Sequence, residues 1–248
     1  MMDRLLQATA LAERDHFWFR GFRRFMAPLL ANAVRGRQSP TILDCGCGTG
    51  HNLVWLRRYG AAVGIDLAWT GLTLARSRGE RAIARATAAS LPFPDAVFDV
   101  VTSFDVIYAL DDATESAALG EMFRVLRPGG CLVVNVAAME LLKGNHSVLA
   151  NEIRRYSRAT LGNRLTTTGF RIRRMSYTNA SILPIVAAVR LVQRASGHEE
   201  SHQEISIPPA PLNAALTGAL AVEASLLRFF NMPFGSSLMA LAQKPANC

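Results

Sequence analysis

Short apolar segments alternate with longer segments of helical periodicity through the middle of the chain. The short segments predict strands, because a strand buried on both faces reads as a nearly continuous apolar run. They are Thr41–Cys45, Ala61–Asp66, Ala82–Thr87, Phe98–Phe104 and Cys131–Ala137. The segments between them predict helices, over His51–Tyr59, Ala68–Gly79 and Ala113–Leu126. This alternation predicts an α/β fold, with a parallel sheet and helices on both of its faces.

The two ends of the chain follow other patterns. Residues 4–35 have helical periodicity, and Pro28 is expected to break that helix because proline lacks a backbone donor. Near the other end, Ser157–Thr168 predicts a helix, and Phe170–Thr178 and Ser237–Gln243 predict strands. An apolar helical insertion of about fifty residues separates these two strands, and its proline-rich segment 208–211 is expected to be non-helical.

The composition is that of one globular domain with a strongly basic surface. Half of the 248 residues are hydrophobic, which is enough for one α/β domain without disulfides. The four cysteines have neither zinc-site nor disulfide-framework spacing, and a reducing cytoplasm is the expected location. Helix capping explains Asp111 and Asp112 better than metal binding, so no metal is predicted. The formal net charge of +8 is carried mainly by arginines at 14–37 and 154–174. Such a basic face either binds an anionic partner or is an ordinary solvated surface.

A glycine-rich turn follows the first predicted strand. Asp44 lies near the end of that strand, and Gly46, Gly48 and Gly50 follow at alternate positions before a helix. Glycines there permit positive φ and a close approach of the backbone to a ligand. Ligands of open α/β sheets bind at the carboxyl ends of strands. The turn alone therefore predicts a nucleotide-like ligand without identifying it, since dinucleotide sites use a related turn.

Four segments, taken in order, resemble the motifs of class I S-adenosylmethionine-dependent methyltransferases, in particular the type 11-like, bacterial small-molecule branch. They are Ile42–Gly50, Val63–Asp66, Leu91–Val101 and Arg124–Gly130. The resemblance implies S-adenosylmethionine as cofactor and S-adenosylhomocysteine as product. It also implies a seven-stranded, mostly parallel Rossmann-like sheet in the order 3-2-1-4-5-7-6, with strand 7 antiparallel.

The same resemblance divides a single methyltransferase domain, 1–248, into three parts. These are an N-terminal helical lid at 1–40, a cofactor-binding core at 41–140, and an acceptor-side region at 141–248 with its helical insertion at about 179–235.

The resemblance also implies which residues hold the cofactor. The turn around Gly46 and Gly48 would pack on its methionine part, and Asp66 would accept hydrogen bonds from the ribose. Thr87 stands where many relatives carry an acid for the adenine amino group, so the backbone amide of Ala88 is a further candidate. The expected set is Phe17, Arg20, Asp44, Gly46, Cys47, Gly48, Asp66, Leu67, Thr87, Ala88, Phe104 and Asp105.

Two other segments resemble a narrower set of bacterial methyltransferases. Glu13–Arg20 is similar to an opening in which a helix covers the cofactor. Phe17 or Trp18 would then lie over the sulfonium, and Arg20 or His16 would meet the carboxylate. The alternative is that these aromatic side chains anchor the core. Gly144–Tyr156 is similar to a segment that borders the acceptor.

Methyl transfer is an in-line displacement, in which the enzyme mainly positions the reactants. A general base is needed only where the acceptor loses a proton. His146 is the first candidate because its ordinary pKa is near neutrality, and Tyr156, Tyr108 and Asp105 follow. The alternative for His146 is a loop histidine with an ordinary hydrogen bond.

The apolar insertion predicts a small, hydrophobic acceptor, such as a secondary metabolite, with any anionic end meeting Arg154 or Arg155. Two alternatives stay open. One is a catalytically silent, cofactor-binding regulatory or partner subunit. The other is a modifier of an anionic macromolecule or of a membrane lipid. Nucleic acid is disfavoured because no nucleic-acid module is present, whereas peripheral membrane contact, a monomer and a homodimer are all compatible with the sequence.

Overall fold

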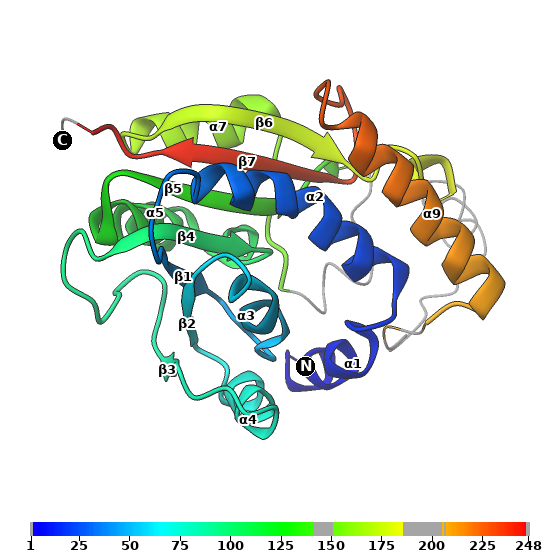
Figure 1. Cartoon of the computed structure of the whole chain (residues 1–248), viewed down its shortest axis with the longest axis horizontal. Coiled ribbons are helices and arrows are strands. Elements are labelled where there is room, and N and C mark those ends of the chain that lie inside the picture. The colour runs from blue at the N-terminus through cyan, green and yellow to red at the C-terminus, as the bar shows by residue number, and fades with distance from the viewer. Residues whose placement is uncertain (1, 141–150, 186–204, 206, 247–248) are drawn as a thin grey trace.

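The computed structural model describes residues 2–140, 151–185, 205 and 207–246. A seven-stranded sheet runs through the molecule (Figure 1). Its strands are β1 (Thr41–Cys45), β2 (Ala61–Asp66), β3 (Ile83–Arg85), β4 (Phe98–Phe104), β5 (Leu126–Ala137), β6 (Arg171–Thr178) and β7 (Ser237–Gln243). Their order is β3-β2-β1-β4-β5-β7-β6, and β7 is antiparallel to both of its neighbours. The predicted order and the predicted antiparallel strand are confirmed.

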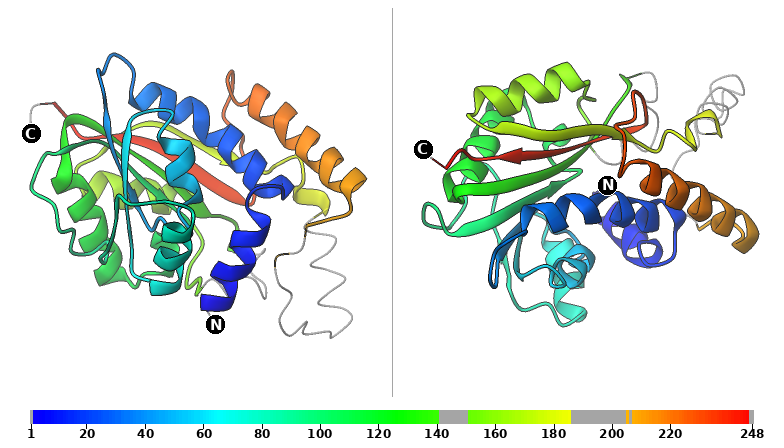
Figure 2. Two further views of the ribbon diagram at one scale, coloured as in Figure 1. Left: turned by 60° about the horizontal axis from the view of Figure 1, so that its bottom comes forward. Right: turned by 45° about the horizontal axis from the view of Figure 1, so that its top comes forward.

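Helices cover both faces of this sheet, because successive residues of a strand point to opposite sides. Leu43 and Val101 join one apolar cluster, and their neighbours Ile42 and Val100 join the other. The first cluster packs against α5 (Asp112–Val125) and α7 (Arg158–Thr167). The second packs against α2 (Phe17–Ala33), α3 (His51–Leu56) and α9 (Ala210–Leu226). Figure 2 shows α2 and α9 side by side on their face.

The predicted helix break at Pro28 is wrong. The chain instead forms α1 (Met2–Ala12), a turn, and α2, which continues through Pro28. His16 begins α2 by accepting the backbone N–H of Trp18 on Nδ1 at 3.1 Å. Proline removes one hydrogen bond of the helix, but burial of the side chains around it, such as Met26 and Leu29, offsets that loss.

The apolar insertion contributes α9, which packs against the N-terminal helices. The helix begins at Ala210, inside the segment expected to be non-helical, because Pro211 lies in the first turn, where its missing N–H costs nothing. Gly21 allows the close packing of α2, since a Cβ there would clash with Leu220. The side-chain oxygen of Asn213 accepts the backbone N–H of Phe17 at 2.8 Å. Contacts formed only in the folded chain therefore hold the N-terminal helices in place.

Smaller differences concern the ends of elements. Strand β3 is shorter than predicted, and β5 begins earlier than predicted, at Leu126. The short helix α4 (Trp69–Ser77) follows β2 as expected. Within the described ranges, no helix is both long enough and apolar enough to cross a bilayer.

Candidate cofactor and acceptor site

The glycine turn lies between β1 and α3 at the carboxyl end of the sheet. Gly46 has φ +85° and Gly50 has φ +77°, a region that favours glycine. A Cβ on Gly46 would clash with Val106, so the turn also passes too close to the end of β4 for a side chain. The backbone N–H groups of Gly46 and Cys47 both donate to the carbonyl of Ile65, at 2.8 and 2.9 Å. The turn is thereby fixed to the end of β2.

Asp44 is buried at the end of β1, beside this turn, with 1% of its surface exposed. Its Oδ1 accepts the hydroxyl of Thr102 at 2.6 Å. Its Oδ2 is buried and has no hydrogen-bond partner in the described part of the chain. Burial raises the pKa of Asp44 to about 7. A buried carboxylate oxygen without a partner is costly, and a cationic or N–H group of a bound ligand would satisfy it.

Asp66 ends β2 and faces the same turn. Its Oδ2 accepts the backbone N–H of Gly48 and its Oδ1 accepts that of Ala68, both at 2.7 Å. Each carboxylate oxygen can accept a further hydrogen bond, so the two oxygens remain able to bind a pair of hydroxyl groups. The neighbouring Leu67 is exposed. The structure therefore presents an oriented carboxylate and an apolar side chain next to the glycine turn.

The predicted adenine residues lie just after β3. The hydroxyl of Thr87 accepts the backbone N–H of Ala89 at 3.3 Å, so Thr87 stabilises its own turn. Ala88 is half-buried against the first apolar cluster. Neither residue supplies a negative charge at this position.

The end of β4 places Phe104 and Asp105 at the same edge of the sheet. Phe104 is buried edge-on against Phe22 of α2, with ring centroids 5.0 Å apart. Asp105 has φ +59°, and its Oδ1 accepts a hydrogen bond from the side-chain amide of Asn135 at 2.9 Å. Desolvation raises the pKa of Asp105 to about 7. Asn135, on β5, was not singled out by the sequence, because only the pairing of Phe104 with Asn135 brings it beside Asp105.

Comparison with known proteins agrees with this geometry. Residues 43–134, from β1 into β5, match a family model described as a methyltransferase domain. A Mycolicibacterium smegmatis protein described as a probable S-adenosylmethionine-dependent methyltransferase is 32% identical over 166 residues, which cover 65% of this chain and 62% of that protein. The demethylmenaquinone methyltransferase of Thermus thermophilus is 42% identical over 102 residues, covering 38% of this chain and 45% of that enzyme.

The similarity to the methyltransferase domain thus extends over residues 43–134, which are less than half of the chain. The chain spans less than two thirds of the length of these curated relatives. The matched residues contain the glycine turn, Asp66 and Asp105, but neither α2 nor α9.

Two solved structures show the same fold over most of the chain. Phosphoethanolamine N-methyltransferase 2 of Haemonchus contortus, in complex with S-adenosyl-L-methionine, is 18% identical with a TM-score of 0.62, covering 98% of this chain and 57% of that one. The [4+2]-cyclase SpnF is 21% identical with a TM-score of 0.55, covering 90% of this chain and 81% of that one. Because the second is a cyclase, the fold alone does not determine the reaction.

The residues predicted as general bases differ in where the structure places them. His146 lies outside the described residues. Tyr156 is buried, its hydroxyl donates to the carbonyl of Ile107 at 3.4 Å, and burial raises its pKa. Tyr108 is also buried, and burial raises its pKa as well. A raised pKa makes a phenolate scarcer near neutral pH, so this placement argues against either tyrosine as a base.

The two arginines expected to meet an anionic acceptor already have acidic partners. Arg154 forms ion pairs with Asp112 and Glu115, and Arg155 pairs with Glu152. Their charges therefore stabilise the fold of this region, and the expectation that they face the acceptor finds no support. Among the described residues, no group of three His, Cys, Asp or Glu side chains is arranged to hold a metal.

The aromatic residues at the start of α2 pack mainly on one another and on the core. Trp18 stacks on Phe22 with ring centroids 5.8 Å apart, which fits the alternative of a core anchor. Phe17 is half-buried and stacks on His16 at 4.4 Å. Arg20 is exposed. A role of Phe17 and Arg20 at the cofactor stays a prediction.

A buried network ties the N-terminal helices to the glycine turn, and its role was not predicted. The hydroxyl of Thr49, inside the turn, donates to the carboxylate of Glu13 at 2.7 Å. Arg78, at the end of α4, forms an ion pair with the same carboxylate and donates to the carbonyl of Thr49 at 3.2 Å. Leu6 of α1 lies over Gly48, since a Cβ there would be 3.6 Å from its side chain. The signal in the sequence was Glu13 itself, at the start of the segment that resembles the methyltransferase opening.

Proposed function

We propose that the protein transfers a methyl group from S-adenosylmethionine to a small, hydrophobic acceptor. The observation that carries this proposal is the buried Oδ2 of Asp44, which has no partner in the described residues and lies beside the glycine turn, where Gly46, Gly48 and Gly50 have positive φ. An ammonium group, such as that of the methionine part of the cofactor, satisfies such an oxygen by a charge-assisted hydrogen bond.

The surrounding residues fit the rest of the cofactor. The backbone of Gly46 and Gly48 would pack along the amino-acid part, and the carboxylate of Asp66 would accept the two ribose hydroxyls. Leu67 would cover one side of the adenine, with the backbone of Ala88 as a hydrogen-bond partner. When bound, S-adenosylmethionine supplies a methyl carbon on a positively charged sulfur and leaves as S-adenosylhomocysteine.

We propose that Asp105 is the general base that takes the proton from an O–H or N–H acceptor. With a pKa of about 7, its carboxylate is partly ionised at neutral pH and can take a proton without being a strong base. The side-chain amide of Asn135 holds one oxygen at 2.9 Å, which leaves the other to face the acceptor. His146 remains a second candidate on the acceptor side.

The hydrophobic nature of the acceptor is supported by the apolar surroundings of α9. A groove of about 300 Å³ runs beside this helix and is lined mainly by apolar side chains, among them Val222, Leu226, Met232 and Phe234. The Thermus relative is named for demethylmenaquinone, an acceptor that is a small molecule. That similarity lies in the part of the chain shared with the cofactor core, so the acceptor itself stays a proposal.

Calorimetry with S-adenosylmethionine, followed by transfer of a labelled methyl group to fractionated small-molecule extracts, tests this function. We expect cofactor binding in the wild type, weaker binding in Asp44→Asn, and unchanged binding in the control Asp95→Asn, whose carboxylate is exposed on the loop before β4. Binding without transfer to any fraction would indicate the silent, cofactor-binding alternative. Absence of cofactor binding would refute the proposal.

A further inference from the structure

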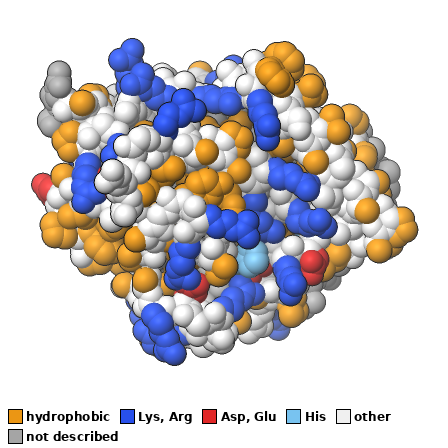
Figure 3. All heavy atoms as spheres, in the orientation of Figure 1, with side chains coloured by type: hydrophobic (Ala, Val, Ile, Leu, Met, Phe, Trp, Pro, Cys, Tyr) orange, Lys and Arg blue, Asp and Glu red, His pale blue; other side chains and the backbone are white. Residues whose placement is uncertain are grey.

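The segment that follows α9 exposes an unusual group of large apolar side chains. We call residues 227–235 the aromatic tip; its Phe229, Phe230 and Phe234 are 80%, 57% and 51% exposed. Val222 and Leu226 on the last turns of α9 extend this surface, and with Phe234 they line the apolar groove. Figure 3 shows the hydrophobic side chains gathered at the corner where α9 ends. Soluble proteins rarely leave such contiguous apolar surface exposed without a partner.

An arginine-lined pocket lies next to the aromatic tip. It has a volume of about 460 Å³, and its lining contains Arg35, Arg37, Arg173 and Arg174 but no acidic side chain. Arg37 forms an ion pair with Asp99, which is not one of the lining residues, so its charge is compensated. Arg173 donates to the neutral side chain of Gln243 at 2.7 Å, and Arg35 is exposed without an ion pair in the described ranges. Uncompensated like charges around one concavity favour an anionic occupant.

Arg174 connects the pocket to the tip. It lines the pocket, and its guanidinium donates to the carbonyl of Leu227, to that of Phe230 at 3.4 Å, and to the side chain of Asn231 at 3.1 Å. Arg228 lies within the tip, exposed and without an ion pair among the described residues. The cationic and the apolar surfaces are therefore in direct contact.

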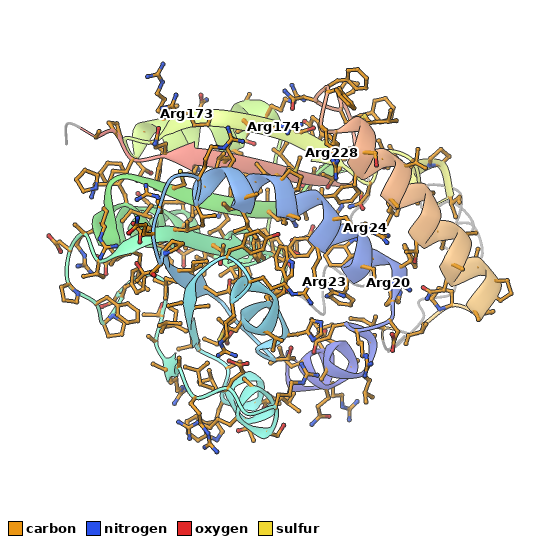
Figure 4. The ribbon with its side chains drawn as sticks, viewed as in Figure 1. Arg20, Arg23, Arg24, Arg173, Arg174 and Arg228 are labelled. Atoms are coloured by element: carbon orange, nitrogen blue, oxygen red, sulfur yellow. The ribbon has the colours of Figure 1, made fainter. Side chains whose placement is uncertain are left out.

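The same face carries further arginines. Figure 4 labels Arg173, Arg174 and Arg228 beside β6 and α9, and Arg20, Arg23 and Arg24 along α2. In the same orientation, basic side chains spread across the surface while acidic ones are sparse (Figure 3). The positive charge thus forms a broad field rather than one small site.

We propose that this face docks on an anionic lipid bilayer, with Phe229 and Phe230 entering the interface and the arginine-lined pocket receiving lipid phosphate. Aromatic side chains settle at the headgroup level, and cations next to them are attracted to an anionic leaflet. A single dissolved anion would use the pocket and leave the tip exposed. A second copy of this face would meet its own charge, and a nucleic acid would leave the aliphatic side chains of Val222 and Leu226 exposed.

The proposal goes beyond methyl transfer, and it is tested without the cofactor. Sedimentation of the full chain with vesicles of phosphatidylcholine, with and without about one third phosphatidylglycerol, measures binding in about 0.1 M salt. We expect strong binding only to the anionic vesicles. Phe229→Ser/Phe230→Ser should weaken it at least about tenfold, because the apolar insertion is lost. Arg173→Gln/Arg228→Gln should weaken it about 25-fold, at about fivefold for each charge.

A matched control removes the same charge from the opposite edge of the sheet. Arg76→Gln/Arg81→Gln alters two exposed arginines at α4 and just before β3. It should bind within about twofold of the wild type, because β3 and β6 are at opposite edges of the sheet, six strand spacings of about 4.8 Å apart, and salt screens charges beyond about 10 Å. Urea denaturation confirms that each variant is folded.

Three results would overturn the proposal. Equal weakening by Arg173→Gln/Arg228→Gln and by Arg76→Gln/Arg81→Gln, with wild-type binding by Phe229→Ser/Phe230→Ser, would reduce the effect to net charge. Displacement of the protein from vesicles by millimolar inorganic phosphate would indicate a dissolved-anion site. Binding to single-stranded RNA that the Phe229→Ser/Phe230→Ser variant retains, together with no binding to vesicles, would indicate a nucleic-acid surface.

Discussion

Replacing Asp44 with asparagine should stabilise the cofactor-free protein at neutral pH relative to the wild type while weakening its binding of S-adenosylmethionine. The carboxylate is buried, one oxygen has no partner in the described residues, and burial raises its pKa from 3.8 to about 7. Folding therefore disfavours the ionised form of Asp44, whereas a bound ammonium group would favour it. Asparagine keeps the shape and the oxygen that accepts the hydroxyl of Thr102, but it removes the charge.

The size of the effect follows from the two pKa values. Between pH 5 and pH 7, Asp44 is largely protonated in the folded protein and ionised in the unfolded chain, so the folded state binds one more proton. Stability then falls by about 1.4 kcal/mol per pH unit as the pH rises, which amounts to about 2–3 kcal/mol across this window. The asparagine variant lacks this contribution. Loss of one charge-assisted hydrogen bond should weaken cofactor binding by about 1.5–3 kcal/mol, or about 10- to 150-fold.

Urea denaturation of the cofactor-free proteins at pH 5 and pH 7 measures the first effect, and calorimetry at pH 8 measures the second. The free energies of unfolding of the wild type and Asp44→Asn should diverge with pH, in favour of the variant. A parallel pH dependence of the two proteins would show that Asp44 does not titrate as described. An unchanged cofactor affinity would show that its free oxygen does not face the ligand.

Three further predictions concern neighbouring parts of the site. Gly46→Ala should lower the free energy of unfolding by about 2–5 kcal/mol, because alanine there has a positive φ and clashes with Val106. The control Gly36→Ala, with positive φ but open space around it, should lose only about 1–2 kcal/mol. Equal losses in urea denaturation would show that the clash does not contribute. Glu13→Gln should lower the free energy of unfolding by about 1–3 kcal/mol, because the partly buried Arg78 loses its charged partner. The control Asp15→Asn alters an exposed neighbour and should change it by less than about 0.5 kcal/mol in the same assay. Once an O–H or N–H acceptor is found, the methyl-transfer rate should rise with pH to a plateau above about 7. Asp105→Asn should lower this rate about 10²- to 10⁴-fold and flatten the pH profile without weakening cofactor binding. A pH profile unchanged in the variant would assign proton removal to another residue, with His146 the next to be tested.

Much of the cofactor side could be predicted because its determinants are local in sequence. The apolar run Thr41–Cys45 and the acid that ends Ala61–Asp66 specify strands and their carboxyl ends, and both strands have the predicted bounds. Parallel neighbours bring those ends together at one edge of the sheet. The glycines of the turn require no distant partner to adopt positive φ.

Predictions failed where the deciding contact is distant in sequence. Pro28 looked like a helix break, but packing of α2 on the sheet and on α9 outweighs one lost hydrogen bond. Two placements could likewise not be derived from the sequence. Tyr156 is buried, and its segment pairs with Ala138. Glu13 meets Thr49 and Arg78 only in the folded chain.

Contiguous residues specify the strands of the sheet and the glycine turn and predict the class of the cofactor, because strand periodicity, positive φ and short motifs are local properties of the chain. Tertiary structure alone decided the ionisation of Asp44 and Asp105, since a pKa depends on the solvent that packing removes. It also placed the arginines of β6 beside the phenylalanines that follow α9. Arg174 and Phe230 are more than fifty positions apart in the sequence and yet contact each other at this surface. They do so because the chain returns to pair β7 antiparallel with β6 at the same edge of the sheet.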